Sequence, residues 1–149
     1  MLIEDAIYQI LKANAAVTAR VAGRFFSGVA PQTVHATPYI VYRADGHEIV
    51  GTLEGGCELV RTRIEIFSAA TTAGDAALTD AAVIKALHEF RGTVVKEDTS
   101  PEESIVVQGI YATPNCHEHG YVDKTKLHEF FSEFDCHYTD PSRITESEP

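Results

Sequence analysis

The chain has 149 residues, of which 44% are hydrophobic and 23% charged, and this is the size and composition of one globular domain. Its formal net charge of −10 argues against DNA or RNA binding through phosphate contacts, because such binding depends on clustered Lys and Arg side chains. The three cysteines, Cys57, Cys116 and Cys136, are odd in number and widely spaced, which disfavours a disulfide framework and favours a cytosolic protein with free thiols.

The N-terminal segment predicts a helix. Residues 2–12 place apolar side chains at spacings of three and four, which is typical of an amphipathic helix with one buried face. Asn14 is a suitable cap for a short helical turn that stops at Gly23. A short extended piece is expected directly afterwards, over residues 24–27.

Two strands are expected in the middle of the chain. Residues 39–42 form a compact apolar run after Pro38 and predict a strand over residues 39–45, and residues 59–68 alternate apolar and charged side chains with the period of a β-strand. Between them, residues 45–58 are polar and contain several glycines, with neither helical periodicity nor the brevity of a tight turn. We therefore expect a long loop between the two strands.

The second half of the chain predicts one more helix and two more strands. Residues 73–90 carry an apolar stripe of mostly small side chains that includes Ala77, Ala81 and Ile84, which predicts a helix that packs closely on a sheet. Strands are expected over residues 104–113 and 127–138. The whole pattern predicts an α+β fold, in which two helices pack on one face of a mainly antiparallel sheet of about four strands.

Residues 1–138 are expected to form this single domain, and residues 139–149 a polar C-terminal tail. Asp80 lies at the edge of the apolar stripe, where the pattern gives it no role. No apolar run of about 18 residues is present, and acids stand near the N-terminus where a signal peptide carries basic residues, so we expect no membrane association.

The densest cluster of reactive side chains runs from Cys116 to His119. Cysteine thiolates and imidazoles are preferred zinc ligands, but a tetrahedral site needs four that converge. Cys116 and His117 are adjacent and cannot easily aim at one ion. Cys136 and His137 would point to opposite faces of a strand. We therefore expect no metal and no cofactor, with a small metal-binding or hydrolytic α+β domain that uses this cluster as an alternative.

The sequence also lacks the motifs of common enzyme classes. It contains no nucleophile elbow, no phosphate-binding loop and no dinucleotide fingerprint. Clear strand patterns and long polar segments, without a set of catalytic residues, are typical of a structural or interaction protein. We therefore expect that the protein is not an enzyme.

Six segments occur in a characteristic order: the opening IEDAIYQILKANAAVTARVAGR, the TPYIVY strand, the TLEG loop, the RTRIEIFSA strand, an Ala-rich helix that ends in ALHEF, and the closing EFDCHY strand. Together they resemble the small tail completion or tail terminator proteins of long-tailed phages, prophages and gene transfer agents. The resemblance covers about residues 2–138, and Cys136 and His137 depart from the usual valine and aromatic residue. The matching positions are Pro38, Tyr39, Tyr42, Gly55, Arg63, Ile64, Ile66, Phe134 and Tyr138.

The resemblance implies a structural virion protein of a siphovirus-like particle, located in the tail–neck region and assembled in the cytoplasm of the bacterial host. It implies a hexameric ring that caps the tail tube, ends tube polymerisation and joins the tail to the head. The expected partners are further copies of the chain, the tail tube protein and a head–neck protein, while DNA passes through the channel without specific binding. Another ring protein of the neck, a stopper or connector, is the nearer alternative.

In such a ring, residues 45–58 would form an arm that reaches an adjacent subunit or the tube, and a surface loop without contacts is the alternative. Two acids of this arm, Glu48 and Glu54, are expected to line the channel, where like charge would keep DNA from adhering to the wall. The expected contact residues are Gly46, Glu48, Gly51, Glu54, Gly55, Gly56, Arg61 and Arg63.

Overall fold

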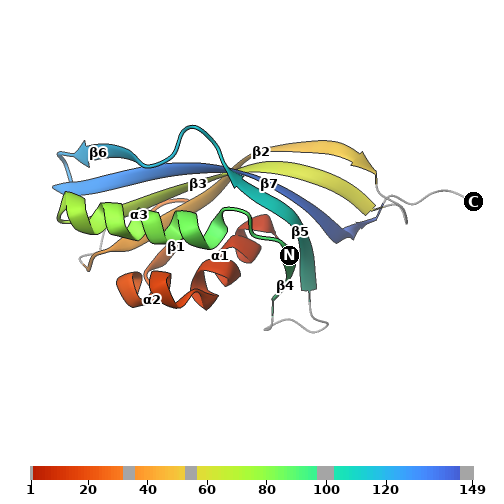
Figure 1. Ribbon diagram of the computed structural model, residues 1–149, viewed down its shortest axis with the longest axis horizontal. Coiled ribbons are helices and arrows are strands. Elements are labelled where there is room, and N and C mark those ends of the chain that lie inside the picture. Colours follow the sequence, from red (N-terminus) through yellow and green to blue (C-terminus); the bar gives the residue numbers. More distant parts are fainter. Residues whose placement is uncertain (1, 32–35, 53–56, 97–102, 145–149) are drawn as a thin grey trace, which may run out of the picture.

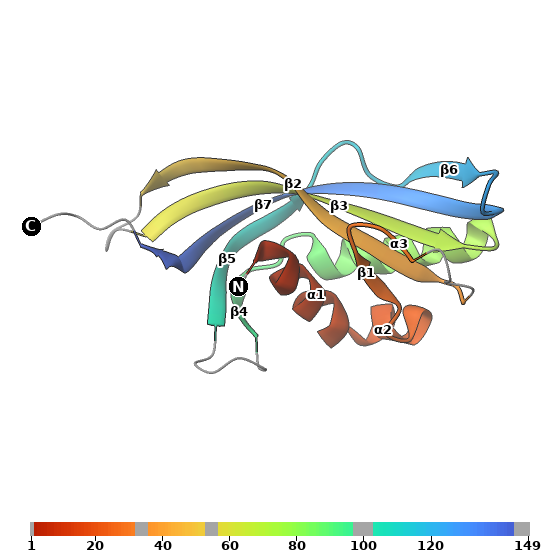
Figure 2. The same ribbon diagram turned by 180° about the vertical axis from the view of Figure 1, so that it is seen from behind.

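A computed structural model describes residues 2–31, 36–52, 57–96 and 103–144. It has one sheet with helices on one side of it, and both views show that the helices share this side (Figures 1 and 2). The elements in chain order are α1 (Ile3–Ala13), α2 (Ala15–Val21), β1 (Phe25–Ser27), β2 (Tyr39–Thr52), β3 (Cys57–Ala70), α3 (Ala73–Leu87), β4 (Gly92–Lys96), β5 (Glu103–Ala112), β6 (Glu118–Val122) and β7 (Leu127–Ile144).

The sheet has seven strands, in the order β1-β2-β3-β7-β5-β4, with β6 paired to the other part of β7. It curls into a half-barrel, and β1 pairs parallel to β2 while the other pairs are antiparallel. The expectation of about four strands and two helices was therefore wrong. The short extended piece expected over residues 24–27 is β1, but β4 and β6 were missed, because strands of five residues are too short to show a clear alternation of apolar and polar side chains.

The missed helix α2 is the segment that the sequence suggested as a short turn. Asn14 caps it, because its side-chain oxygen accepts a hydrogen bond from the backbone N–H of Val17 at 3.1 Å. Ala22, in the left-handed conformation, ends the helix just before Gly23. The helix buries Val17 and Val21 in the core.

The prediction of a long loop over residues 45–58 was also wrong for the residues that the structure describes. β2 continues to Thr52 and β3 begins at Cys57, so the two strands form a long hairpin. Two irregularities interrupt their pairing, between Asp45 and His47 and between Ile49 and Gly51. Gly46 adopts φ +76° at the first of them, a conformation that favours glycine. The polar, glycine-containing sequence therefore belongs to a bulged strand.

β7 is the other long strand, and it too runs further than the sequence predicted. The expected end was residue 138, but pairing with β3 continues to Ile144, which is opposite Cys57. The extended hairpin provides the backbone donors and acceptors for this pairing. The ends of β2, β3 and β7 consequently project together beyond the helices (Figure 1).

The core lies between the helices and one face of the sheet. Helix α1 buries Ile7 and Leu11 completely, and the sheet contributes Ile64 and Phe134 to the same cluster. We call the other side of β2, β3 and β7 the open face, because none of the described helices covers it. The alternation of side chains along these strands sends every second residue to the open face.

Candidate interaction surface

The open face is divided into an apolar and a charged half. The charged half carries side chains of both signs on neighbouring strands. Arg43 Nε lies 3.2 Å from Glu65 Oε1, and Arg63 Nε lies 3.6 Å from Glu133 Oε1. In both pairs the arginine side chain is about half exposed and the glutamate side chain is mostly buried. The exposed arginines contribute to recognition, since a pattern of charges selects a complementary surface.

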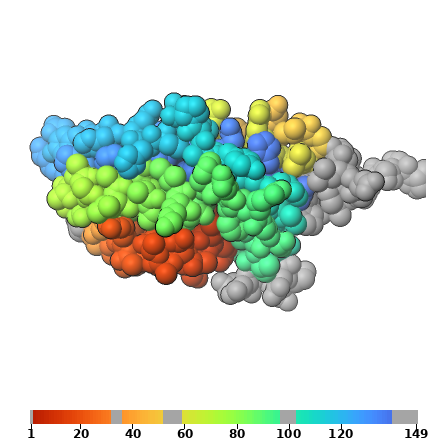
Figure 3. Space-filling view, viewed as in Figure 1, coloured from red at the N-terminus to blue at the C-terminus, as the bar shows by residue number. Residues whose placement is uncertain are grey.

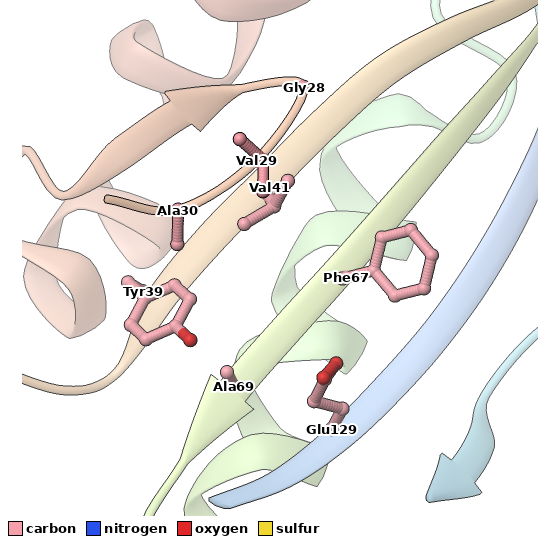
Figure 4. Close-up of a pocket in the computed structure, with 8 residues that line it drawn as sticks. All are labelled: Gly28, Val29, Ala30, Tyr39, Val41, Phe67, Ala69 and Glu129. Carbon is pink, nitrogen blue, oxygen red and sulfur yellow. The ribbon is translucent and has the colours of Figure 1, made fainter. Parts of the chain in front are cut away.

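The apolar half of the open face is hollowed into a pocket of about 290 Å³ (Figure 4). Beside the pocket the rings of Phe67 and Phe131 pack with centroids 5.1 Å apart, and the Arg43 guanidinium lies 5.1 Å from the Phe67 centroid. The lining residues come from β2, β3, β7 and the segment after β1, and are Gly28, Val29, Ala30, Tyr39, Val41, Phe67, Ala69 and Glu129.

Glu129 is the one charged side chain in this lining. Among the described residues it has no hydrogen-bond or ion-pair partner, and burial raises the pKa of its carboxyl group. Burial also raises the pKa of Tyr39, with the Glu129 charge as the second cause. An ionised carboxylate in such surroundings is favoured by any cation brought next to it. The pocket therefore suits an apolar group accompanied by a positive charge.

The second surface feature is the projecting end of the hairpin, which we call the hairpin end and define as residues 46–52 of β2 with 57–62 of β3. Ile49 and Val50 are 52% and 51% exposed there. Glu48 and Arg61 form an ion pair across the two strands, and both side chains remain largely exposed. Figure 3 shows this end as yellow and orange atoms outside the layer of helices.

The residues predicted for subunit contact lie mostly on this hairpin. Gly46 and Gly51 mark its two irregularities, and Glu48 and Arg61 pair with each other. Arg63 lies further along β3, opposite Asp135, and contacts Glu133. Three other predicted residues, Glu54, Gly55 and Gly56, lie outside the described residues. The structure thus brings the described members together on one hairpin.

A buried polar cluster under the sheet was missed in the sequence. Asp80 of α3 is fully buried, and the hydroxyl of Ser132 donates to its carboxylate at 2.9 Å. The Nδ1 atom of His117 lies 2.7 Å from Asp80 Oδ2, and the His117 backbone N–H donates to Ser132 Oγ at 3.0 Å. Burial raises the pKa of Asp80, while the hydrogen bonds from His117 and Ser132 oppose that shift.

This cluster joins α3, β7 and the segment that leads into β6. In a nucleophile–base pair the serine hydroxyl would contact the imidazole, but here it contacts the carboxylate. The arrangement is therefore structural. The only signal in the sequence is a carboxylate within an Ala-rich helical stripe.

Side chains in the reactive stretch from Cys116 to His119 contact different partners. The Cys116 thiol donates to the Glu133 carbonyl at 3.2 Å, and His119 Nε2 lies 2.9 Å from His128 Nδ1. Cys136 is buried in the core, and burial raises its pKa to about 12. Within the described ranges no group of three or more His, Cys, Asp or Glu side chains could hold a metal ion.

Across these same ranges, none of the helices is long and apolar enough to cross a membrane. A sheet with one open face, a projecting hairpin and side chains grouped for contact defines a protein that acts through its surfaces. The family model for "Tail completion protein gp17" matches residues 5–99. The chain belongs to the tail completion protein gp17 family, a family of structural proteins of the virion tail.

A solved structure has a similar fold. It is a chain from the virion of a native gene transfer agent (GTA) particle, with a TM-score of 0.61 and 18% sequence identity. The similarity covers 92% of this chain and 94% of that chain. At this identity the similarity shows the fold alone. No curated relative matches the chain by sequence.

Proposed function

We propose that the protein forms a closed ring, expected to be a hexamer, at the end of a tail tube. There it ends tube polymerisation and joins the tail to the head, without enzymatic activity. Family membership is the observation that carries this proposal. The partners would be further copies of the chain, the tail tube protein and a head–neck protein, in the neck region of a siphovirus-like particle assembled in the bacterial cytoplasm.

The shape of the chain supports a ring. The hairpin end and the apolar pocket lie at opposite ends of β2 and β3, so the chain presents two different contact surfaces. Two different surfaces on one subunit produce heterologous contacts, which close into a ring when the rotation between neighbours divides a full turn. An isologous dimer would instead use one surface twice.

The acids on the hairpin have a proposed place in the same ring. Glu48, with Glu54, would face the channel and repel passing DNA, so that the duplex makes no specific contact with the wall. In the structure Arg61 pairs with Glu48 and offsets its charge locally. The repulsion of DNA by Glu48 in the proposed channel therefore depends on whether its ion pair with Arg61 persists after assembly.

The experiment is removal of the gene from a particle-producing strain, followed by electron microscopy of tails and heads. We expect tubes of irregular and excessive length that are not attached to heads, and complementation by the wild-type gene should restore both defects. Tubes of normal length with unstable filled heads would contradict termination and indicate a stopper or connector. Mass measurement of the purified ring gives the subunit number independently.

A further inference from the structure

We infer that helix α3 of one subunit docks across the apolar pocket on the open face of the next subunit, with Leu78 in the pocket and Lys85 beside Glu129. The inference rests on the proposed ring and deepens it, because it names the two surfaces that meet. The occupant of the pocket is thus a second copy of this chain, and the hairpin end is a separate surface that this contact does not use.

The pocket sets the chemistry that its occupant must have. Tyr39 and Phe67 offer an apolar surface, and Val29 at its border is 76% exposed in the single chain. Glu129 adds a half-buried carboxylate that has no hydrogen-bond or ion-pair partner among the described residues, and burial disfavours its charged form. A fitting occupant therefore carries an aliphatic side chain and a cation on the same face.

The exposed face of α3 has this combination. Leu78 is 52% exposed, and Lys85 is exposed two helical turns later, so both side chains lie on the same face of the helix. Ala81 between them is small and exposed, which allows close approach to a sheet. Lys85 forms no ion pair among the described residues. Figure 3 shows α3 as green atoms at the surface of the helix layer.

The spacing of the apolar and charged groups agrees on the two surfaces. Leu78 and Lys85 are about 10.5 Å apart along the helix axis, at a rise of 1.5 Å per residue. On the sheet, Tyr39 is opposite Ala69, and Ala69 is opposite Glu129. Two strand spacings of about 4.8 Å therefore separate Tyr39 from Glu129, which is roughly 10 Å. A helix that crosses the strands can place Leu78 against Tyr39 while Lys85 reaches Glu129.

The arrangement of the layers excludes this contact within one chain. Helix α3 and the open face lie on opposite sides of the same sheet, so α3 can only cover the pocket of another copy (Figures 1 and 2). Two other exposed apolar sites fit less well. Ile49 and Arg61 lie on opposite faces of the hairpin, and Lys126, the cation near Tyr121, is already in an ion pair. Contact between α3 and the open face joins two different surfaces, as a closed ring requires.

The first test uses disulfide cross-linking. The parent variant carries Cys57→Ser and Cys116→Ser and retains Cys136, whose side chain is buried and inaccessible to oxidation. Val29→Cys and Leu78→Cys are added together, at exposed positions of the pocket and of α3. We expect mild oxidation to give a ladder of linked subunits in denaturing gels that ends at the ring size.

The matched control combines Val29→Cys with Val50→Cys, because Val50 is 51% exposed but belongs to the hairpin end. We expect the control to stay monomeric. Rings that form normally, but in which the control links as well as or better than the α3 pair, would overturn the docking of α3 and leave the proposed ring intact. Products that stop at a dimer would overturn the head-to-tail arrangement, and a parent chain that never assembles would overturn both proposals.

The second test reverses the two charges without cysteines. Glu129→Lys and Lys85→Glu should each abolish the ring species in native mass spectrometry, because like charges would then face each other in an apolar contact. The double variant restores opposite charges and should recover the ring. Glu4→Lys makes the same charge change on α1 and should retain the ring. Circular dichroism checks that each variant folds. Folded single variants that assemble like the wild type, or a folded double variant that assembles no better than the single ones, would overturn the pairing of Lys85 with Glu129.

Discussion

Replacement of Asp80 tests whether the buried polar cluster stabilises the fold. The carboxylate is fully buried and has two partners, Ser132 Oγ at 2.9 Å and His117 Nδ1 at 2.7 Å. Hydrogen bonds to a charged group contribute about 1.5–3 kcal/mol each, so the two partners correspond to a gross loss of about 3–6 kcal/mol in Asp80→Ala. Removal of the buried charge returns part of this loss, because the carboxylate no longer has to be desolvated.

The net destabilisation expected for Asp80→Ala is therefore about 2–4 kcal/mol, a large fraction of the stability of an ordinary domain. Asp80→Asn keeps the shape and one acceptor oxygen, and we expect it to cost less than about 1 kcal/mol. Urea unfolding followed by circular dichroism measures both free energies. An Asp80→Ala variant within about 0.5 kcal/mol of the wild type would refute the structural role assigned to the cluster.

The pH dependence of stability tests whether desolvation of Asp80 or its attraction to His117 has the larger effect on the pKa of Asp80. Burial raises the pKa of Asp80 above its ordinary value of 3.8, so the folded state binds this proton more tightly than the unfolded state. The contribution of Asp80 to stability is then greatest below its ordinary pKa and declines as the pH rises through its folded pKa. Asp80→Asn cannot titrate and lacks this decline. Its deficit relative to the wild type should therefore shrink as the pH increases above 4, and a deficit that grows would show that attraction to His117 outweighs desolvation.

Four further outcomes are expected. Ile49→Ser with Val50→Ser should leave unfolding nearly unchanged, because both side chains are exposed, but should prevent ring formation in light scattering; retained rings would contradict the role of the hairpin end. Purified protein should contain no stoichiometric zinc by elemental analysis and should keep its unfolding midpoint in chelator, whereas about one zinc per chain would support a metal site. Cys136 should resist alkylation until the chain unfolds, because its pKa is raised to about 12 and its side chain is buried, and rapid labelling of the native chain would contradict this. Particles with Glu48→Lys and Glu54→Lys should assemble but release DNA slowly and in a salt-dependent manner, and normal release would place these acids away from the channel.

Helices and strands could be predicted from the sequence where one face of the element is buried and the opposite face is exposed to solvent. Residues 2–12 and 59–68 show this contrast, and the structure has α1 and β3 there. The hairpin was misjudged for the same reason, because residues 45–51 of β2 are all exposed, so this half of the strand has no buried face that would give it an alternating pattern.

The polar cluster was missed because the buried face of α3 is rotated from the expected stripe. The structure buries Ala76, Asp80 and Val83, whereas Ala81 of the expected stripe is exposed. A carboxylate at the centre of a buried face requires Ser132 and His117 from distant parts of the chain, and local spacing does not reveal such partners. The pocket on the open face could not be predicted from local spacing for the same reason, because its lining combines residues from β2, β3 and β7.

The pairing of β3 with β7 has a mechanical consequence. These strands run antiparallel from Cys57 and Ile144 at one end to Ala70 and His128 at the other, along the line that joins the hairpin end to the pocket. The hydrogen bonds between antiparallel strands lie perpendicular to the strands, so tension along this line loads many of them in shear at the same time. Strands that are peeled apart from one end lose their bonds one after another and separate under lower force. In a ring joined through these two ends, outward pressure would therefore load each subunit along the direction in which its β3–β7 pairing is strongest.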